Sequence, residues 1–292
     1  QKNDFVVKSG NKMRVLSYSD LFQTQFDQQS FQQYKVGSNA EQAISGAVKY
    51  VTADVTPTVY FTQGHDERKV DDEYKTVKEY LGRNNYDVKT VNLATTDKVP
   101  KDAQIVIVAS PKRDLTTDEM NRLQDYLSNG GNAILMFDPS ETNTNLDNFQ
   151  KLLQPYNVAV DYDKVKENDG QRHVPNKVYD ILPDIQSNDM NKLLDPANFA
   201  MIMPESRSLS ILKNTKQYIT VTSLMKSSDK AVGEQIDKSK GADLPGPLDL
   251  AVAVENKGGL NPSKLLVMGN GFFMTDTAIS QYQQLSVNGL YF

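Results

Sequence analysis

The sequence lacks several residues and patterns on which common activities depend. It contains no cysteine, which excludes disulfides, thiolate nucleophiles and thiolate metal sites together. Its two histidines, His65 and His173, lie far apart, so we expect no metal site, because zinc needs several ligands at suitable spacing. We also expect no cofactor, since no glycine-rich phosphate-binding motif and no Gly-x-Ser-x-Gly motif occurs.

Charge and hydropathy argue against binding to nucleic acid or anionic lipid and against a membrane-spanning helix in this sequence. The formal net charge is -5, so the chain has no basic field to attract nucleic acid or an anionic lipid surface. No run approaches the roughly 18 apolar residues that a membrane-spanning helix needs. The chain begins at Gln1 and shows no basic and apolar leader, which predicts that the natural polypeptide has been trimmed and that flanking segments are missing.

The most informative stretch lies between residues 55 and 67. The β-branched and aromatic run Thr58–Thr62 stops at Gly64, and three ionisable residues follow. Apolar residues then recur at helical spacing from Val70 to Leu81. This is how a buried parallel strand ends, turns and enters a helix.

The segments up to residue 157 follow the order β-α-β-β-α-β-α, which favours an α/β fold with a parallel sheet. Thr116 and Glu119 have the spacing of a capping box at the start of a helix. We predict a flavodoxin-like sheet in the order 2-1-3-4-5, whose strands begin near Thr58, Tyr86, Ile105, Ala133 and Lys264.

The remaining segments do not follow this alternation of strands and helices. The pattern predicts a β-hairpin over residues 4–18, a polar loop over Gln23–Gln33, and a flexible surface segment over Asp229–Pro247. A helix is expected from Gly271 to the end. We predict four regions: a hairpin region, 1–40, that packs with the second lobe; an α/β sandwich domain, 41–157; an inserted β-rich lobe, 158–258; and a return strand and helix, 259–292, that complete the α/β domain.

In this topology, the loops at the carboxyl ends of the strands converge on one crevice, where ligands bind in open α/β sheets. The candidate ligand-binding residues are Gly64, His65, Asp66, Glu67, Ser110, Lys112, Arg113, Asp138 and Asn270. Each has a structural alternative: Asp66 and Glu67 suit a helix N-terminus, Lys112 and Arg113 suit a solvated loop, and Asp138 suits a turn.

An ordered set of motifs runs along the chain: Tyr60–Glu67, Val99–Ala103, Ser110-Pro111-Lys112, Gly130-Gly131-Asn132, Asp138-Pro139, Gly246–Val254, Leu265–Asn270 and Asn288–Phe292. Together these motifs resemble the gliding-motility-associated (GldG-like) auxiliary component of ABC transporters. The resemblance implies a class I glutamine-amidotransferase-like α/β fold in an extracytoplasmic region carried between membrane helices. Enzymes of that fold place a cysteine nucleophile after an interior strand, so the absence of cysteine excludes that chemistry here.

The resemblance therefore implies a non-catalytic extracytoplasmic binding or interaction domain of an ABC-2-type transporter auxiliary subunit. Its partners would be the membrane and ATPase subunits, and its ligand a saccharide or a partner protein. Two alternatives stay open. One is a hydrolase that uses His65 with Asp66 or Glu67 as acid and base. The other is a structural spacer of a transport complex, which a broad exposed apolar patch on the β-rich lobe would favour.

Overall fold

The computed structural model describes residues 4–27, 32–53, 55–140, 145–187, 201–213 and 216–282. Contacts between residues divide the chain into two compact units. The first combines residues 1–58 with 78–88, and the second combines 59–77 with 89–292. The predicted boundaries at residues 40, 157 and 258 stay predictions, as does the packing of the first region against the second lobe.

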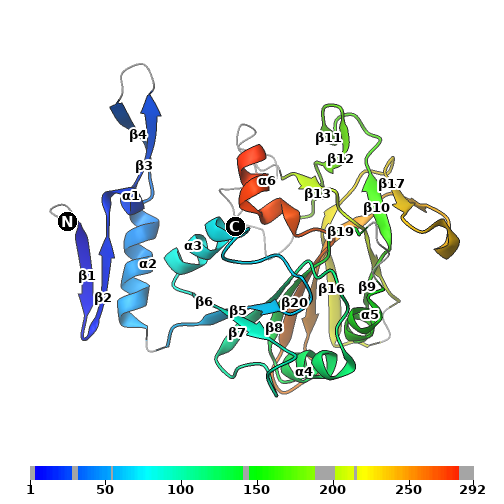
Figure 1. Ribbon diagram of the computed structural model, residues 1–292, viewed down its shortest axis with the longest axis horizontal. Coiled ribbons are helices and arrows are strands. Elements are labelled where there is room, and N and C mark those ends of the chain that lie inside the picture. The colour runs from blue at the N-terminus through cyan, green and yellow to red at the C-terminus, as the bar shows by residue number, and fades with distance from the viewer. Residues whose placement is uncertain are drawn as a thin grey trace. The chain divides into compact units, whose positions relative to one another are not determined.

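The first unit contains two hairpins and helical segments (Figure 1). Strands β1 (Phe5–Ser9) and β2 (Lys12–Leu16) pair antiparallel, as the sequence predicts. A small apolar core forms where Leu16 and Leu21 meet Ala47 of α2 (Ala40–Thr52), and the short helix α1 (Tyr18–Leu21) leads from β2 into the second hairpin.

The prediction of a loop over Gln23–Gln33 is wrong. Strands β3 (Phe22–Asp27) and β4 (Gln32–Ser38) pair antiparallel, and residues 28–31 lie outside the described residues. Phe22, Thr24 and Phe26 alternate with glutamine along β3. That period of two is a strand signal which the polar composition of the segment conceals.

The main sheet of the second unit carries the five strands expected from the sequence, in the predicted order. Pairs β7–β8 and β8–β20 are parallel. The strands are β6 (Asp87–Asn92), β5 (Thr58–Gln63), β7 (Ala103–Ala109), β8 (Asn132–Met136) and β20 (Ser263–Met268).

Beyond β20 the sheet continues with strands from the middle of the chain. Strand β19 (Asp249–Asn256) pairs antiparallel with β20, and β16 (Ile219–Lys226) pairs antiparallel with β19. The short strand β13 (Asp184–Ile185) ends this side. The sheet is therefore mixed, and the region after residue 158 supplies part of it.

Helices of the second unit pack against the apolar core of this sheet. Helix α4 (Thr117–Ser128) begins at the predicted capping box: Thr116 N donates to Glu119 Oε2 at 2.8 Å, and Glu119 N donates to Thr116 Oγ1 at 3.3 Å. Leu123 and Leu127 of α4 pack into the same core as α5 (Asp147–Leu153). The other helices are α3 (Lys75–Arg83) and α6 (Asp276–Gln281).

The prediction of a flexible surface segment over Asp229–Pro247 is also wrong. This segment contains β17 (Val232–Gln235), a 3-10 helix (Lys238–Lys240) and β18 (Leu244–Pro245). Strand β17 pairs with both β10 (Asp163–Lys166) and β18. The polar composition of this segment wrongly suggests a flexible loop, because main-chain pairing can stabilise a strand whose side chains are half exposed.

Short strands complete the second unit. They are β9 (Val158–Val160), β11 (His173–Val174), β12 (Lys177–Ile181), β14 (Met203–Pro204) and β15 (Leu209–Ile211), and a 3-10 turn (Gln154–Tyr156) precedes β9. The helix expected after Gly271 is present as a 3-10 turn (Phe272–Met274) and α6, and residues 283–292 lie outside the described residues. Among the helices described, none has the length and apolar character needed to cross a membrane.

Candidate functional site

A hollow of about 340 Å³ lies at the carboxyl ends of β5 and β6, beside the loop after β7. This is the edge at which the sequence predicts ligand binding. The lining residues come from the ends of β5 and β6, the loop after β5 and one residue of the loop after β7. They are Phe61, Thr62, Gln63, Gly64, Asp66, Glu67, Arg68, Lys69, Val70, Thr90, Asn92 and Arg113.

The loop after β5 has an unusual backbone. Gly64 has φ 124°, and a Cβ there would lie 3.2 Å from Asn92 Oδ1. Glycine therefore allows both the positive φ and the close approach of β6. Asp66 has φ 56°, a conformation that strains a residue with a side chain. Such strain persists only where surrounding contacts hold the loop.

Those contacts come from the loop after β7. Arg113 Nε lies 2.8 Å from Asp66 Oδ2, and Arg113 Nη2 donates to Gly64 O at 2.8 Å. The main-chain N–H groups of Lys112 and Arg113 donate to His65 O at 2.8 and 3.2 Å. The two loops that the sequence predicts to flank the crevice thus lie side by side.

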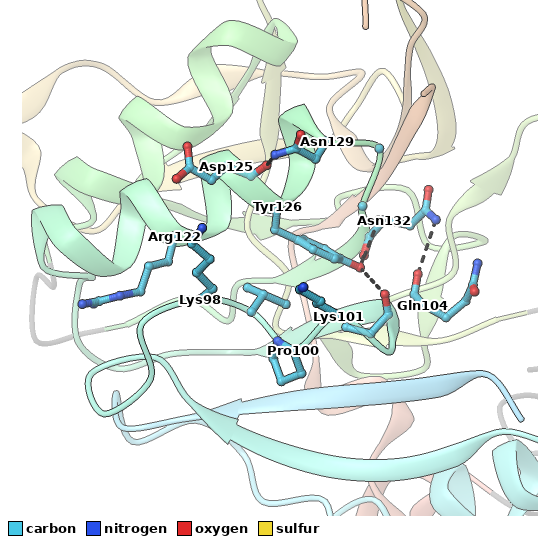
Figure 2. A pocket seen from close by; sticks show the side chains of 13 residues that line it. Lys98, Pro100, Lys101, Gln104, Arg122, Asp125, Tyr126, Asn129 and Asn132 are labelled. Atoms are coloured by element: carbon cyan, nitrogen blue, oxygen red, sulfur yellow. Dashed lines mark hydrogen bonds between the residues drawn. The ribbon is translucent and has the colours of Figure 1, made fainter. Parts of the chain in front are cut away.

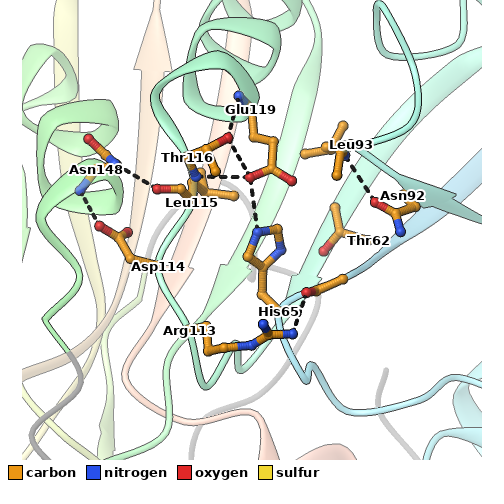
Figure 3. Close-up of polar contacts among 12 residues, drawn as sticks. Thr62, His65, Asn92, Leu93, Arg113, Asp114, Leu115, Thr116, Glu119 and Asn148 are labelled. Atoms are coloured by element: carbon orange, nitrogen blue, oxygen red, sulfur yellow. Dashed lines mark hydrogen bonds and ion pairs between the residues drawn. The ribbon is translucent and has the colours of Figure 1, made fainter.

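His65 fixes the same loop to the start of α4 (Figure 3). Its Nε2 lies 3.1 Å from Glu119 Oε2, and its Nδ1 lies 3.4 Å from Glu67 Oε1. Glu67 also accepts from His65 N at 2.7 Å and from Thr62 Oγ1 at 2.9 Å. All three ionisable side chains are buried. A buried imidazole between two carboxylates braces the loop.

The pKa values follow from this geometry. The hydrogen bond with Glu67 raises the pKa of His65, and the charges of Glu119 and Glu67 add to the effect against the opposing burial. Burial opposes ionisation of both glutamates. Their hydrogen bonds prevail, so the pKa of each is lowered: Glu67 bonds chiefly with His65, and Glu119 chiefly with Thr116. The geometry therefore favours the charged form of all three groups.

Asp138, after β8, organises the neighbouring turn. Its Oδ1 accepts from Gly271 N at 2.7 Å and from Phe272 N at 3.2 Å, while its Oδ2 accepts from Arg68 Nε at 2.8 Å. Asn270 is fully buried: its Nδ2 donates to Pro204 O, and its Oδ1 accepts from Phe273 N at 2.8 Å. Both side chains therefore shape the turns at this edge of the sheet.

The structure thus places all nine predicted residues at the carboxyl ends of the strands but separates them by depth. Gly64, Asp66, Glu67 and Arg113 line the hollow, whereas His65, Ser110, Lys112, Asp138 and Asn270 are not among its lining residues. Ser110 is buried at φ 54°, and its hydroxyl has no hydrogen-bond partner among the described residues. The described residues include no group of three or more histidine and carboxylate side chains that could hold a metal ion.

Sequence reasoning missed several residues of this edge. Arg68, Thr90 and Asn92 line the hollow, and Glu119 completes the brace around His65. The alternation of β6 predicts which of its residues share a face, but not that Asn92 meets Gly64. Glu119 was recognised only as a capping residue, since nothing in the sequence relates it to a histidine 54 positions away.

One comparison with known proteins shows the family of this chain, and another shows a similar fold. A family model described as an ABC-type uncharacterized transport system (ABC_transp_aux) matches residues 56–289. The mmIFT52 N-terminal domain is similar in structure, with 17% identity, a TM-score of 0.60, and coverage of 80% of this chain and 100% of that chain. No curated protein sequence matches this chain.

Two other solved structures are more distant. The exo-β-1,4-mannosidase Op5Man5 from Opitutaceae bacterium strain TAV5 is 12% identical, with a TM-score of 0.44, over 86% of this chain and 38% of that chain. A ThuA-like protein from Bacteroides uniformis is 14% identical, with a TM-score of 0.39, over 74% of this chain and 82% of that chain. Likeness at this level carries no functional argument.

Proposed function

Because this chain belongs to the family of ABC-type transport system auxiliary components, we propose that it is the extracytoplasmic binding domain of a GldG-like auxiliary subunit of an ABC-2-type exporter. Its partners are then the membrane and ATPase subunits, and flanking membrane helices outside this sequence anchor it. The observed strand order supports a further proposal, that the α/β part is related to flavodoxin-like and amidotransferase-like sheets.

We place ligand recognition in the hollow at the carboxyl ends of β5 and β6, and the observation that carries this is the braced loop. Arg113 holds the strained Asp66 from one side, and His65 ties the loop to α4 from the other. A site whose backbone is already fixed loses little conformational freedom when a ligand binds. Main-chain and amide groups of Gln63 and Asn92 suit a neutral polar ligand, and we propose a saccharide.

The hydrolase alternative receives no support from this geometry. A general base must reach the proton that it abstracts. Both ring nitrogens of His65 instead face buried carboxylates, and His65 is not among the residues lining the hollow. The spacer alternative would be favoured by a broad exposed apolar patch. Within the described part of 158–258, the large exposed apolar side chains are Ile211 and Tyr218, and these two do not make a broad patch.

The proposal is tested by thermal shift with a panel of neutral mono- and disaccharides. A ligand present at about ten times its dissociation constant stabilises the folded state by about 1.4 kcal/mol, which raises Tm by about 3–5 °C. Gln63→Ala combined with Thr90→Ala should abolish this rise, since both side chains line the hollow and are exposed.

The matched control is Gln171→Ala combined with Thr220→Ala, which removes the same side chains from exposed positions elsewhere. This control should keep the full shift. Equal shifts in both double variants would place the saccharide outside the hollow, and the absence of any shift across the panel would exclude saccharide recognition here.

A further inference from the structure

A second hollow, of about 570 Å³, has the lining side chains that Figure 2 shows. It is formed by the segment before β7, the second half of α4 and the turn that leads into β8. Its lining residues are Lys98, Val99, Pro100, Lys101, Ala103, Gln104, Arg122, Asp125, Tyr126, Asn129, Gly130, Gly131 and Asn132. Since β7 and β8 are parallel, this hollow sits at their amino ends, away from the saccharide site proposed above.

The charge of this second hollow opposes that of the chain. Lys98, Lys101 and Arg122 line it with one carboxylate, Asp125, whereas the chain as a whole carries -5. Arg122 donates to two neutral acceptors, Leu93 O at 3.1 Å and Asp97 O at 3.3 Å, so these bonds orient its guanidinium without neutralising it. Within the described part of the chain, Lys98 and Lys101 form no ion pair. The local excess of positive charge is therefore available to an anion.

The wall of the hollow is held in place before any ligand arrives. Tyr126 Oη lies 3.1 Å from Asn132 O and 3.2 Å from Asn132 N. A Cβ on Gly131 would lie 2.4 Å from the Tyr126 ring, so this glycine lets the main chain pass against the ring. Val99 and Pro100 add apolar surface beside it, as Figure 2 shows for Pro100. These contacts fix the position of the Tyr126 ring in the wall.

Amide groups distinguish this hollow from a simple anion site. Gln104 is exposed at one end, and Asn129, which also lines the hollow, has its amide held by a hydrogen bond from Nδ2 to Asp125 O. A small inorganic anion matches the lysines but not these amides or the apolar wall. A polypeptide with acidic side chains offers carboxylates, main-chain N–H and C=O groups, and aliphatic stems together.

We propose that this hollow, at the amino ends of β7 and β8, binds an acidic segment of a partner polypeptide. Carboxylates of the segment meet Lys98 and Lys101 at the rim, and its main chain runs along α4 past Asn129. Because the hollow is open, the association is salt-dependent and weakens as ionic strength rises. The two hollows lie at opposite edges, so this contact leaves the saccharide site accessible.

The test is fluorescence anisotropy with a labelled peptide of alternating glutamate and alanine, in buffer of about 50 mM ionic strength, where screening is weak. Two exposed charge pairs together contribute about a tenfold change in affinity. The double reversal Lys98→Glu and Lys101→Glu should therefore weaken binding by at least about tenfold. Lys98→Arg with Lys101→Arg should retain it. Both positions are exposed, so these variants should fold.

The matched control is Lys151→Glu with Lys213→Glu, which makes the same change in net charge at other exposed positions and should leave binding within about twofold. Three outcomes overturn the proposal: no binding at low salt, equal loss in the two reversal variants, or equal binding of a peptide with glutamine in place of glutamate. Displacement by citrate at the same carboxylate concentration is a fourth such outcome, because a small-anion site would not need the amides.

Discussion

Removal of His65 tests whether the brace at the carboxyl edge is an ionic structural element. In His65→Ala, the buried carboxylates of Glu67 and Glu119 lose the cation between them. Loss of one partner from a buried ionic contact costs about 3–5 kcal/mol. Thr62 and Thr116 still donate to the two carboxylates, so we expect the lower end, about 3 kcal/mol. In a unit of this size, that lowers Tm by about 10 °C.

The pH dependence gives the sharper test. The pKa of His65 is raised above its usual 6.5, so the stability that the charged ring contributes is complete below about pH 6.5 and is lost as the pH rises through the raised value. The pKa values of Glu67 and Glu119 are lowered, so their contribution is complete above about pH 4.5 and is lost as the pH falls. The difference between wild type and variant should be largest near pH 5.5.

The measurement is urea unfolding followed by far-UV circular dichroism at about pH 5.5, 7 and 9, since the chain has no tryptophan to report by fluorescence. His173→Ala is the matched control: among the described residues, this half-buried ring has one hydrogen bond, between Nδ1 and Val174 O of the adjacent residue, at 2.8 Å. It should change the free energy of unfolding by less than about 1 kcal/mol. A loss for His65→Ala that is equal to the control, or the same at pH 5.5 and 9, refutes the ionic brace.

Three further predictions concern stability and are measured in the same way. Asp138→Ala should lower the free energy of unfolding by about 3 kcal/mol, because Arg68 and two main-chain N–H groups lose their acceptor; the isosteric Asp138→Asn should recover only part of this. Gly269→Ala should cost more than about 3 kcal/mol, since a Cβ would lie 1.9 Å from Arg207 O, whereas Gly170→Ala, with no atom within 4 Å, should be nearly neutral. Burial raises the pKa of Asp163, so its stability contribution is greatest at acid pH and falls as the pH rises through that value. Relative to wild type, the free energy of unfolding of Asp163→Asn should therefore be higher at pH 7 than near pH 4. At pH 7 it should come closest to the wild-type value or exceed it. A relative value that is higher near pH 4 would contradict this burial argument.

The sequence predicts the centre of the fold because local signals and tertiary packing agree there. The buried runs of β5 and β7 stop at loop residues, and the α4 capping box lies where its spacing indicates. The local sequence signals fail where strand pairing, rather than amino-acid composition, determines the secondary structure. Glutamine conceals the period of two in β3, and polar residues conceal β17, which is stabilised by its neighbours in the sheet.

The candidate site could be predicted as an edge of the sheet but not as a set of contacts. Topology alone brings the loops after β5 and β7 together, which the bonds from Lys112 and Arg113 to His65 O confirm. Whether a side chain points into a hollow or into the core depends on the strained backbone at Asp66 and Ser110, and a sequence does not report φ. The contact of Glu119 with His65 could not be predicted either, since the two residues are 54 positions apart in the sequence.

The ends of the large sheet have a consequence for how this domain behaves in a crowded compartment. One end is a two-residue strand, β13, and the other is β6, whose Asp87 and Lys89 carry opposite charges along the outermost backbone. A short rim and a charged rim are both poor templates for an incoming extended chain. Both features therefore lower the tendency of this ten-stranded sheet to pair strand to strand with another copy of the domain.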